Sequence, residues 1–295
     1  MRFYTYETME TEHICVSFDG GKHLYFLSDL GFHFKDMNQL IEEIRKDQME
    51  QLKNISHNLS DFPEADISSM KLCSPIIHPK QDIICLGINY REHAVEAGNF
   101  SQEAFGGERT YMTYFSKRIY RASAHGDPIP SYPSLVDSLD YEAELAVIIG
   151  RDCKGASKAN AVDYIFGYSI MNDVSARNLQ TRHKQWLLGK SLDGFAPMGP
   201  CIVTPDELGD VQNLPIRCKV NGDIRQNSNT KYMIQDVAGA IEELSAAMTL
   251  KAGTIIATGT PAGVGMGMNP PCFLQHGDVV TCEIEGIGKL TNIVD

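Results

Sequence analysis

The stretch that decides the fold is Asp140-Tyr-Glu-Ala-Glu-Leu-Ala-Val-Ile-Ile149. Its apolar residues are typical of a buried strand, in which side chains alternate between the two faces. Glu142 and Glu144 should therefore point to the same face, where like charges repel each other unless a cation lies between them. Carboxylate oxygens suit a hard ion such as Mg²⁺ or Mn²⁺. The pair indicates either a metal site or a solvated strand face.

The composition of the chain disfavours several classes of protein. With 295 residues, 43% of them hydrophobic, the chain can bury one large core or two unequal ones. The formal net charge of −12 argues against nucleic acid and anionic membranes as partners. The sequence shows no signal-peptide pattern, no apolar run near the roughly 20 residues of a membrane span, and no Cys-x-x-Cys pair. We expect a cytoplasmic protein with reduced thiols.

Two parts of the chain differ in their patterns. Residues 1–78 contain strand-like runs, a polar helical stretch and a linker rich in Ser, Pro, Asp and His, and we assign them to a small N-terminal α/β domain with its linker. In the main domain, residues 79–295, strands outnumber helices, and Asn221-Gly222 predicts a β-hairpin. Strands are expected at 114–116, 139–149, 164–171, 200–204, 215–220, 254–258 and 278–284, and helices at 158–164 and 233–248. The predicted fold class is α+β, with a mixed, mostly antiparallel sheet.

A second group of polar residues lies in Gly87-Ile-Asn-Tyr-Arg-Glu-His-Ala-Val-Glu-Ala-Gly98. His93 and Glu96 are neighbours if this segment is a helix. A carboxylate beside an imidazole fixes its tautomer and raises its basicity, which a general base requires. The glycines at both ends would suit the hinges of a mobile lid. The alternative is an exposed ion pair with little effect on stability.

Asp173 is a candidate third carboxylate for the site. It follows the apolar run 166–171, so it lies at the end of a predicted strand. It could equally be the N-cap of a helix. Arg177 and Gln180 follow on the same helical face as Asp173 and would contact either a carboxylate ligand or solvent.

Lys190 and Thr260 are further candidates. Lys190 follows Gly189 and lies close to Asp193, and it either stabilises negative charge as a partly buried lysine or is structural. Gly259 and Thr260 lie in a glycine-rich stretch and could offer a backbone and a hydroxyl donor to an anionic oxygen.

Five segments in this order carry a resemblance to a known family: Gly87-Ile-Asn-Tyr-Arg-Glu-His, Asp140-Tyr-Glu-Ala-Glu-Leu, Asn172-Asp-Val-Ser-Ala-Arg-Asn-Leu-Gln, Gly189-Lys-Ser-Leu-Asp and Ile255-Ile-Ala-Thr-Gly-Thr-Pro-Ala-Gly-Val-Gly. The chain resembles the fumarylacetoacetate hydrolase family over about residues 82–295. Residues 182–193 are similar to a bacterial branch that includes oxaloacetate decarboxylases and acylpyruvate hydrolases. The resemblance implies a mixed β-roll with the active site at its mouth, usually in a homodimer.

The resemblance also implies a role for each polar candidate. It implies a site for Mg²⁺ or Mn²⁺ with three protein ligands, a lid dyad, an active-site lysine and four substrate contacts. The metal ligands are Glu142, Glu144 and Asp173, and the lid dyad is His93 and Glu96. The active-site lysine is Lys190. The substrate contacts are Arg177, Gln180, Lys117 and Thr260. A lysine or arginine head group that fills the space between the three carboxylates would count against the metal.

The chain departs from the family pattern after Phe115. Many relatives have a turn rich in Pro and Ser after the lysine that matches Lys117, whereas Arg118-Ile-Tyr-Arg121 follows it here. The two added cations indicate a longer or dianionic substrate, or surface charge on a loop.

The implied chemistry is metal-dependent cleavage of the C–C bond next to the ketone of a small 2-oxo acid. The ion would bind the carboxylate and the 2-oxo oxygen and, with Lys190, stabilise a pyruvate enolate. If the leaving side is an acyl group, His93 activates water and the reaction is acylpyruvate hydrolysis; if it is a carboxylate, the reaction is decarboxylation of oxaloacetate. An isomerase or tautomerase of a 2-hydroxy-dienoate (hydroxymuconate-type) acid is the alternative, because that reaction needs only proton transfer.

Overall fold

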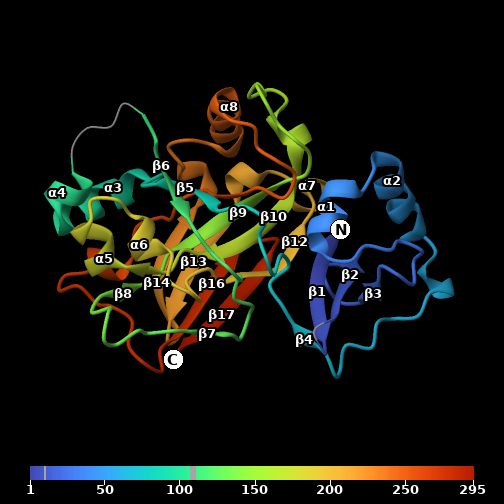
Figure 1. The fold of residues 1–295 in the computed structure, drawn as a ribbon, viewed down its shortest axis with the longest axis horizontal. Coiled ribbons are helices and arrows are strands. Elements are labelled where there is room, and N and C mark those ends of the chain that lie inside the picture. The colour runs from blue at the N-terminus through green and yellow to red at the C-terminus, as the bar shows by residue number, and fades with distance from the viewer. Residues whose placement is uncertain (10, 107–110) are drawn as a thin grey trace.

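Two β-sheets pack against each other in the computed structural model, which describes residues 1–9, 11–106 and 111–295 (Figure 1). In chain order the strands are β1 (Arg2–Thr8), β2 (Thr11–Ser17), β3 (Tyr25–Phe26), β4 (Lys71–Leu72), β5 (Ile83–Gly87), β6 (Thr113–Lys117), β7 (Pro128–Ile129), β8 (Leu139–Asp140), β9 (Ala143–Ile149), β10 (Ile165–Asn172), β11 (Ser175–Ala176), β12 (Met198–Val203), β13 (Pro215–Val220), β14 (Asp223–Asn229), β15 (Ile255–Ala257), β16 (Val279–Ile284) and β17 (Gly288–Val294).

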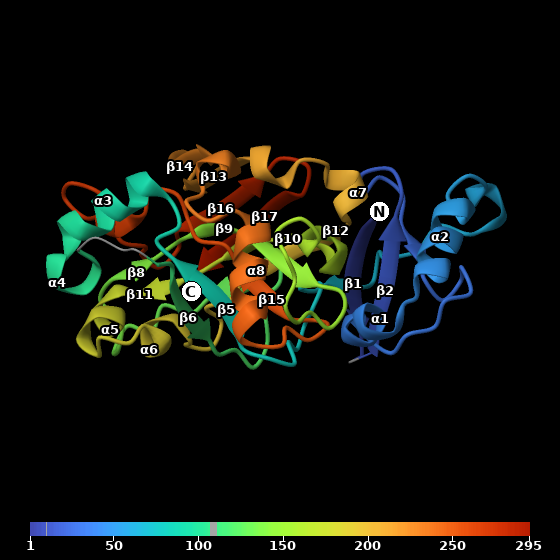
Figure 2. The same ribbon diagram turned by 90° about the horizontal axis from the view of Figure 1, so that it is seen from above.

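Helices flank the sheets. They are α1 (Met37–Glu43), α2 (Lys46–Ile55), α3 (Arg91–Phe100), α4 (Gln102–Phe105), α5 (Arg177–Arg182), α6 (Leu187–Lys190), α7 (Pro205–Leu208) and α8 (Val237–Ala247), with short 3₁₀ turns η1 (Leu59–Asp61), η2 (Ala161–Tyr164), η3 (Val211–Asn213), η4 (Thr230–Tyr232) and η5 (Gly265–Gly267). Figures 1 and 2 show α3 to α6 gathered at one end of the molecule, while α1 and α2 lie at the other.

The sheets confirm the predicted fold class. The larger one has ten strands in the order β3-β2-β1-β12-β10-β9-β15-β5-β6, with β4 beside β1; the smaller one has the order β14-β13-β16-β17-β7, and β8 pairs with β11. Within the described part of the chain, the strands of these sheets pair antiparallel, except that β15 runs parallel to β5 and β17 runs parallel to β7. The fold is therefore mixed and mostly antiparallel, and neither sheet closes into a barrel.

The predicted strands are all present, with one interruption. The expected strand 139–149 is split into β8 and β9, because the backbone N–H groups of Tyr141 and Glu142 donate to the side chains of Asp140 and Asn172 instead of a neighbouring strand. The predicted hairpin is confirmed at Asn221-Gly222, where both residues have positive φ, 54° and 89°.

The two predicted helices have different outcomes. The helix expected at 233–248 is α8, and it begins later because the side chain of Asp236 caps it by accepting the backbone N–H of Gly239. The prediction of a helix at 158–164 is wrong, because only the 3₁₀ turn η2 forms there.

The N-terminal strands are joined to the rest of the chain through the larger sheet. Strand β1 pairs antiparallel with β12, with Arg2 opposite Val203 and Phe3 opposite Ile202. The sheet thus continues from the main domain into the N-terminal segment. The domain division at residue 78 and the homodimer stay predictions.

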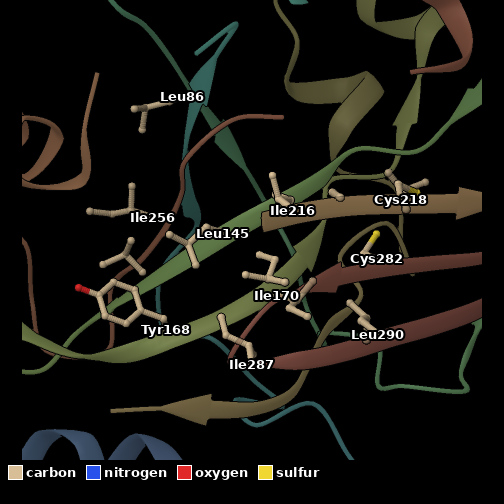
Figure 3. Packing of buried hydrophobic residues seen from close by; sticks show 14 of the residues in the cluster. Leu86, Leu145, Tyr168, Ile170, Ile216, Cys218, Ile256, Cys282, Ile287 and Leu290 are labelled. Atoms are coloured by element: carbon tan, nitrogen blue, oxygen red, sulfur yellow. The ribbon is translucent and has the colours of Figure 1, made fainter. Parts of the chain in front are cut away.

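The main core lies between the two sheets. Figure 3 shows Leu145 and Ile170 from the larger sheet facing Ile216 and Leu290 from the smaller one. All four side chains are at most 1% exposed. Because burying one such side chain stabilises a fold by roughly 1.5–3 kcal/mol, this layer holds the strands that carry the polar residues of the site.

None of the helices in the described part of the chain has the length and apolar character that crossing a lipid bilayer requires.

We expect Leu145→Ala to lower the free energy of unfolding by about 2–5 kcal/mol, because it leaves a cavity between the sheets. Ile224→Ala, at a side chain that is 57% exposed, is the matched control and should change it by less than about 0.5 kcal/mol. Urea denaturation of the two variants measures the difference. Equal losses would mean that the layer between the sheets does not dominate stability.

Candidate active site

Three buried carboxylates meet where β9 begins and β10 ends. Because these strands are antiparallel, with Met171 opposite Glu144, the start of β9 lies beside the end of β10. Glu142, Glu144 and Asp173 each offer an oxygen within 4.8 Å of the others, and all three are buried. In the described part of the chain, no other group of three or more His, Cys, Asp or Glu side chains comes together in this way.

The ammonium group of Lys190 lies between two of these carboxylates. Its Nζ atom is 2.6 Å from Oε2 of Glu142 and 2.7 Å from Oδ2 of Asp173. The two acidic partners outweigh burial and raise the pKa of Lys190, so the side chain is charged. This position of a lysine head group counts against the metal, as the sequence analysis stated, because a cation bound by all three carboxylates would have to replace Lys190 on these two oxygens.

Arg177 holds the far side of Glu142. Its Nη1 atom lies 2.7 Å from Oε1 of Glu142, and its Nε atom lies 2.9 Å from Oδ2 of Asp140. Its Nη1 atom also donates to Oε1 of Gln180 at 3.0 Å. Its Nη2 atom is buried and has no hydrogen-bond partner among the described residues, so the two N–H groups of Nη2 remain available.

Glu144 differs from the other two carboxylates in its partners. Its Oε2 atom accepts the backbone N–H of Gly259 at 2.8 Å, and the described structure shows no ion pair to it. Burial, with the nearby charges of Asp173 and Glu142, raises its pKa well above the ordinary value. Burial acts in the same direction on Glu142, but Lys190 and Arg177 outweigh it and hold the pKa of Glu142 well below its usual range.

The cluster contains more acidic than basic side chains. The acids are Asp140, Glu142, Glu144 and Asp173, and the bases are Lys117, Lys190 and Arg177. Uncompensated charge is costly to bury, so the protein accommodates it by keeping a proton on Glu144. The raised pKa of Glu144 marks the position at which an added cation would be most favourable.

His93 and Glu96 form the predicted dyad on α3. The Nδ1 atom of His93 lies 3.0 Å from Oε2 of Glu96, whose other oxygen accepts the backbone N–H of Gly263 at 2.9 Å. His93 is 4% exposed, so the pair is not the exposed ion pair that the sequence left open. Because Nδ1 is bonded to Glu96, Nε2 is the ring nitrogen left for a ligand.

One small cavity brings most of the candidates together. In this conformation it has a volume of about 10 Å³, room for a single water molecule. Its polar lining residues are His93, Glu142, Glu144, Arg177, Gln180, Lys190 and Thr260. Its apolar walls include Phe105, Phe115 and Trp186, which the sequence did not single out.

Lys117, a substrate contact in the family resemblance, does not line this cavity. It is completely buried behind Asp173, donating to Oδ1 of Asp173 at 2.6 Å and to the backbone oxygen of Val174 at 2.9 Å. It is not part of the cavity lining, so it positions Asp173 and has no access to a substrate in this conformation. Burial lowers its pKa, and Asp173 offsets this only in part.

The donors expected at Gly259 and Thr260 are used within the protein. The hydroxyl of Thr260 donates to the backbone oxygen of Ala143 at 2.9 Å and accepts from the side chain of Gln226. Since a hydroxyl has one hydrogen, Thr260 contacts the cavity without a free donor in this arrangement. The N–H of Gly259 likewise serves Glu144.

The cations after Phe115 do not reach the cavity. The Arg118 side chain is 78% exposed, and Arg121 lies 3.4 Å from Glu7 in the N-terminal segment. The structure therefore favours the interpretation that Arg118 and Arg121 are surface charges over the interpretation that they contact a longer substrate.

Asp140 is a polar residue of the site that the sequence reasoning missed. Besides Arg177, its carboxylate accepts the backbone N–H groups of Gly265 and Met266 at 2.7 and 3.0 Å. It thereby joins α5 to η5. Its place two residues before Glu142 was visible, but Arg177, Gly265 and Met266 lie 37 or more residues away from it and leave no local signal.

Comparison with known proteins identifies the family of this chain. Residues 82–295 match the family model described as fumarylacetoacetate (FAA) hydrolase C-terminal. The match covers well over half of the chain, and the chain belongs to the fumarylacetoacetate hydrolase family of enzymes.

Individual relatives differ in the reactions that their names give. The oxaloacetate tautomerase YisK of Bacillus subtilis (strain 168) is 46% identical over 226 residues, which cover 77% of this chain and 73% of that protein. A fumarylacetoacetate hydrolase from psychrophilic Exiguobacterium antarcticum matches with a TM-score of 0.82 and 37% identity, covering 100% of this chain and 99% of that one. Maleylpyruvate hydrolase from Sphingobium sp. SYK-6, solved with a manganese (II) ion and pyruvate, matches with a TM-score of 0.77 and 28% identity, covering 100% and 98%.

We expect Glu144→Gln and Glu142→Gln to change the stability of the metal-free protein in opposite directions. Folded Glu144 keeps a proton that the unfolded chain releases, so its stabilising contribution is complete below its ordinary pKa of 4.5 and is lost as pH rises toward its raised pKa. Glu144→Gln should remove this loss. Glu142→Gln takes a partner from two buried cations and should cost about 3–5 kcal/mol near neutral pH.

Urea denaturation with a chelator at several values between about pH 5 and 8 measures both effects. If wild type and Glu144→Gln showed the same pH dependence, the charge imbalance assigned to this cluster would be incorrect.

Proposed function

We propose that this chain is a divalent-metal-dependent enzyme that transfers a proton at the carbon next to the ketone of a small 2-oxo acid, interconverting the enol and keto forms of an oxaloacetate-like substrate. The observation that carries the proposal is the position of His93, which is oriented by Glu96 and faces the same cavity as Glu142 and Glu144. A base beside a cluster of carboxylates and cations is the arrangement that proton transfer to and from a carbon acid requires.

The donor set fits a hard divalent ion. Glu142, Glu144 and Asp173 would hold Mg²⁺ or Mn²⁺ through carboxylate oxygens, and the raised pKa of Glu144, to which the described structure shows no ion pair, favours a cation there. When bound, the ion would stabilise negative charge on the 2-oxo oxygen as the C–H bond breaks. The maleylpyruvate hydrolase complex with manganese and pyruvate supports this proposal by analogy.

The cations of the site would hold the substrate. Lys190 lines the cavity and would donate to the oxygen that carries the enol charge when its ammonium group is not bound to Glu142 and Asp173. The unpartnered Nη2 of Arg177 would donate to a carboxylate of the substrate. Both groups favour an anion in a cavity that water barely enters, where electrostatic interactions are strong.

Proton transfer would then take place at His93. In the enol-to-keto direction Nε2 of the neutral imidazole would take the proton from the enol O–H, and the protonated imidazole would then return this proton to the adjacent carbon, so that one O–H bond breaks and one C–H bond forms. Glu96 stabilises the protonated imidazole and is itself held by the N–H of Gly263. No water molecule is consumed, so the small closed cavity suits this reaction. The 46% identity to an oxaloacetate tautomerase supports the same reaction class.

Cleavage of the C–C bond is the second candidate. The likeness to maleylpyruvate hydrolase with bound pyruvate favours it, because the same groups would stabilise a pyruvate enolate after hydrolysis or decarboxylation. Hydrolysis would need room for both the acyl group and a water molecule, and the cavity would have to open further than for tautomerisation.

Binding of Mn²⁺ tests the metal site separately from catalysis. Titration calorimetry should detect Mn²⁺ binding to wild type, and Glu144→Gln should weaken it by at least about tenfold. The control is Glu285→Gln, at an exposed glutamate, which should bind as wild type does. Equal binding by all three proteins would contradict the assignment of Glu144.

Replacing His93 tests the reaction. His93→Asn should lower the enzyme-dependent rate of oxaloacetate enol-to-keto conversion by about 10²–10⁴-fold, because the general acid–base group is lost. Mn²⁺ affinity should be unchanged. His57→Asn, at an exposed histidine, serves as the control. Pyruvate measured in the same reactions separates the candidates: enol loss without pyruvate indicates a tautomerase, and pyruvate formed at a matching rate indicates C–C cleavage.

A further inference from the structure

Two carboxylates of the cluster bind a different cation on each oxygen. Oε1 of Glu142 lies 2.7 Å from Arg177, and Oδ1 of Asp173 lies 2.6 Å from Lys117. The second oxygen of each carboxylate binds Lys190, at 2.6 and 2.7 Å. If Lys190 moved away, each carboxylate would still be paired with one buried cation. Because the costly step is to remove the last partner of a buried charge, the two carboxylates can lose Lys190 at a moderate cost.

Lys190 is also the cation with the fewest anchors. Arg177 donates to Asp140 as well, at 2.9 Å. Lys117 donates to the backbone oxygen of Val174 as well, at 2.9 Å, and does not line the cavity. In the described part of the chain, the ammonium group of Lys190 has no hydrogen-bond partner other than the two carboxylates, and its side chain lines the cavity. Of the three cations, Lys190 is therefore the one that can leave its carboxylates.

The side chain of Lys190 can move while its backbone stays in place. The backbone N–H of Lys190 donates to the backbone oxygen of Trp186 at 3.1 Å, and a Cβ atom at Gly189 would overlap the backbone of Gln180, so α6 packs closely against α5. The four-carbon side chain of a lysine is flexible. The ring centroid of Phe115, which lines the same cavity, lies 5.2 Å from Nζ. Since an aromatic face attracts a cation, the ammonium group keeps a favourable neighbour when it leaves the carboxylates.

We propose that Lys190 occupies the place of the divalent ion in the metal-free protein and leaves it when the ion binds, and that Lys190 thereby determines how tightly the ion binds. This inference rests on the metal site of the proposed function and adds the residue that sets its affinity. The ion has to replace two hydrogen bonds between charged groups, and it binds beside an ammonium group that is buried with it, since Lys190 is 1% exposed. Both effects make ion binding weaker than three carboxylates alone would make it.

The exchange links the ion to the anionic ligand. Without the ion, the ammonium group of Lys190 pairs with the carboxylates and has no strong attraction left for another anion. With the ion bound, the same ammonium group is available to a 2-oxo acid in the cavity. Because such a coupling is reciprocal, the ion and the acid each favour the binding of the other.

The affinity for Mn²⁺ tests this role without any turnover. We would measure it by titration calorimetry for wild type, Lys190→Met and Lys117→Met. Lys190→Met should bind Mn²⁺ at least about tenfold more tightly than wild type, because the two hydrogen bonds between charged groups no longer have to be broken. Lys117→Met is the matched control: Lys117 is also buried and also binds Asp173, but it does not line the cavity. It removes the same charge and should tighten binding less than Lys190→Met does.

Each outcome bears on Lys190. Unchanged or weaker Mn²⁺ binding by a Lys190→Met protein that is folded by circular dichroism, or equal tightening in Lys117→Met, would overturn the inference. If Lys190→Met does not fold, Lys190→Gln retains an uncharged hydrogen-bond donor and should tighten binding in the same direction. Binding of Mn²⁺ by Lys190→Met but not by wild type would retain the inference and reject the proposed metal-dependent reaction. If neither wild type nor the variants bound Mn²⁺, both proposals would fail.

Discussion

The burial of more acidic than basic side chains at one point is the constraint on which the rest of the structure depends. Moving carboxylates out of water costs several kcal/mol each, so Glu142 and Asp173 are tolerated only with cations at hydrogen-bond distance. Those cations come from distant parts of the chain: Lys117 from β6, and Lys190 from α6. The described structure shows no lysine or arginine paired with Glu144, so the burial of its carboxyl group is unfavourable for stability. This is also the position at which a bound cation would be most favourable.

A single loop positions both halves of the site. Backbone N–H groups of this loop bind Glu144 at Gly259, Glu96 at Gly263, and Asp140 at Gly265 and Met266. The carboxylate cluster and the His–Glu dyad are thus fixed to the same short stretch of backbone. Because main-chain donors have little freedom, the distance between the base and the carboxylates depends on the fold of this loop more than on side-chain rotamers.

The sequence could predict the features that depend on local pattern. Strand alternation placed Glu142 and Glu144 on one face, and helical spacing paired His93 with Glu96. It could not separate the roles of two buried lysines. Lys117 and Lys190 bind opposite oxygens of the same Asp173, but only Lys190 reaches the cavity, and that difference arises from contacts across 56 and 17 residues of chain. The sequence also did not predict the aromatic residues that line the cavity, since no local pattern distinguishes a residue such as Trp186 from a core residue.

The expected lid requires a more specific description. Glycines at 87 and 98 suggested hinges, but Gly87 is packed against Trp186, and the start of α3 is fixed by the hydrogen bonds of Asn89. Glu96 adds a further fixed point on the same helix. Directional hydrogen bonds resist displacement more than aromatic contacts do, since rings can slide with a small loss of energy. The base on α3 is therefore held in place by hydrogen bonds at Asn89 and at Glu96, and a lid that moved this helix as a whole would have to break them.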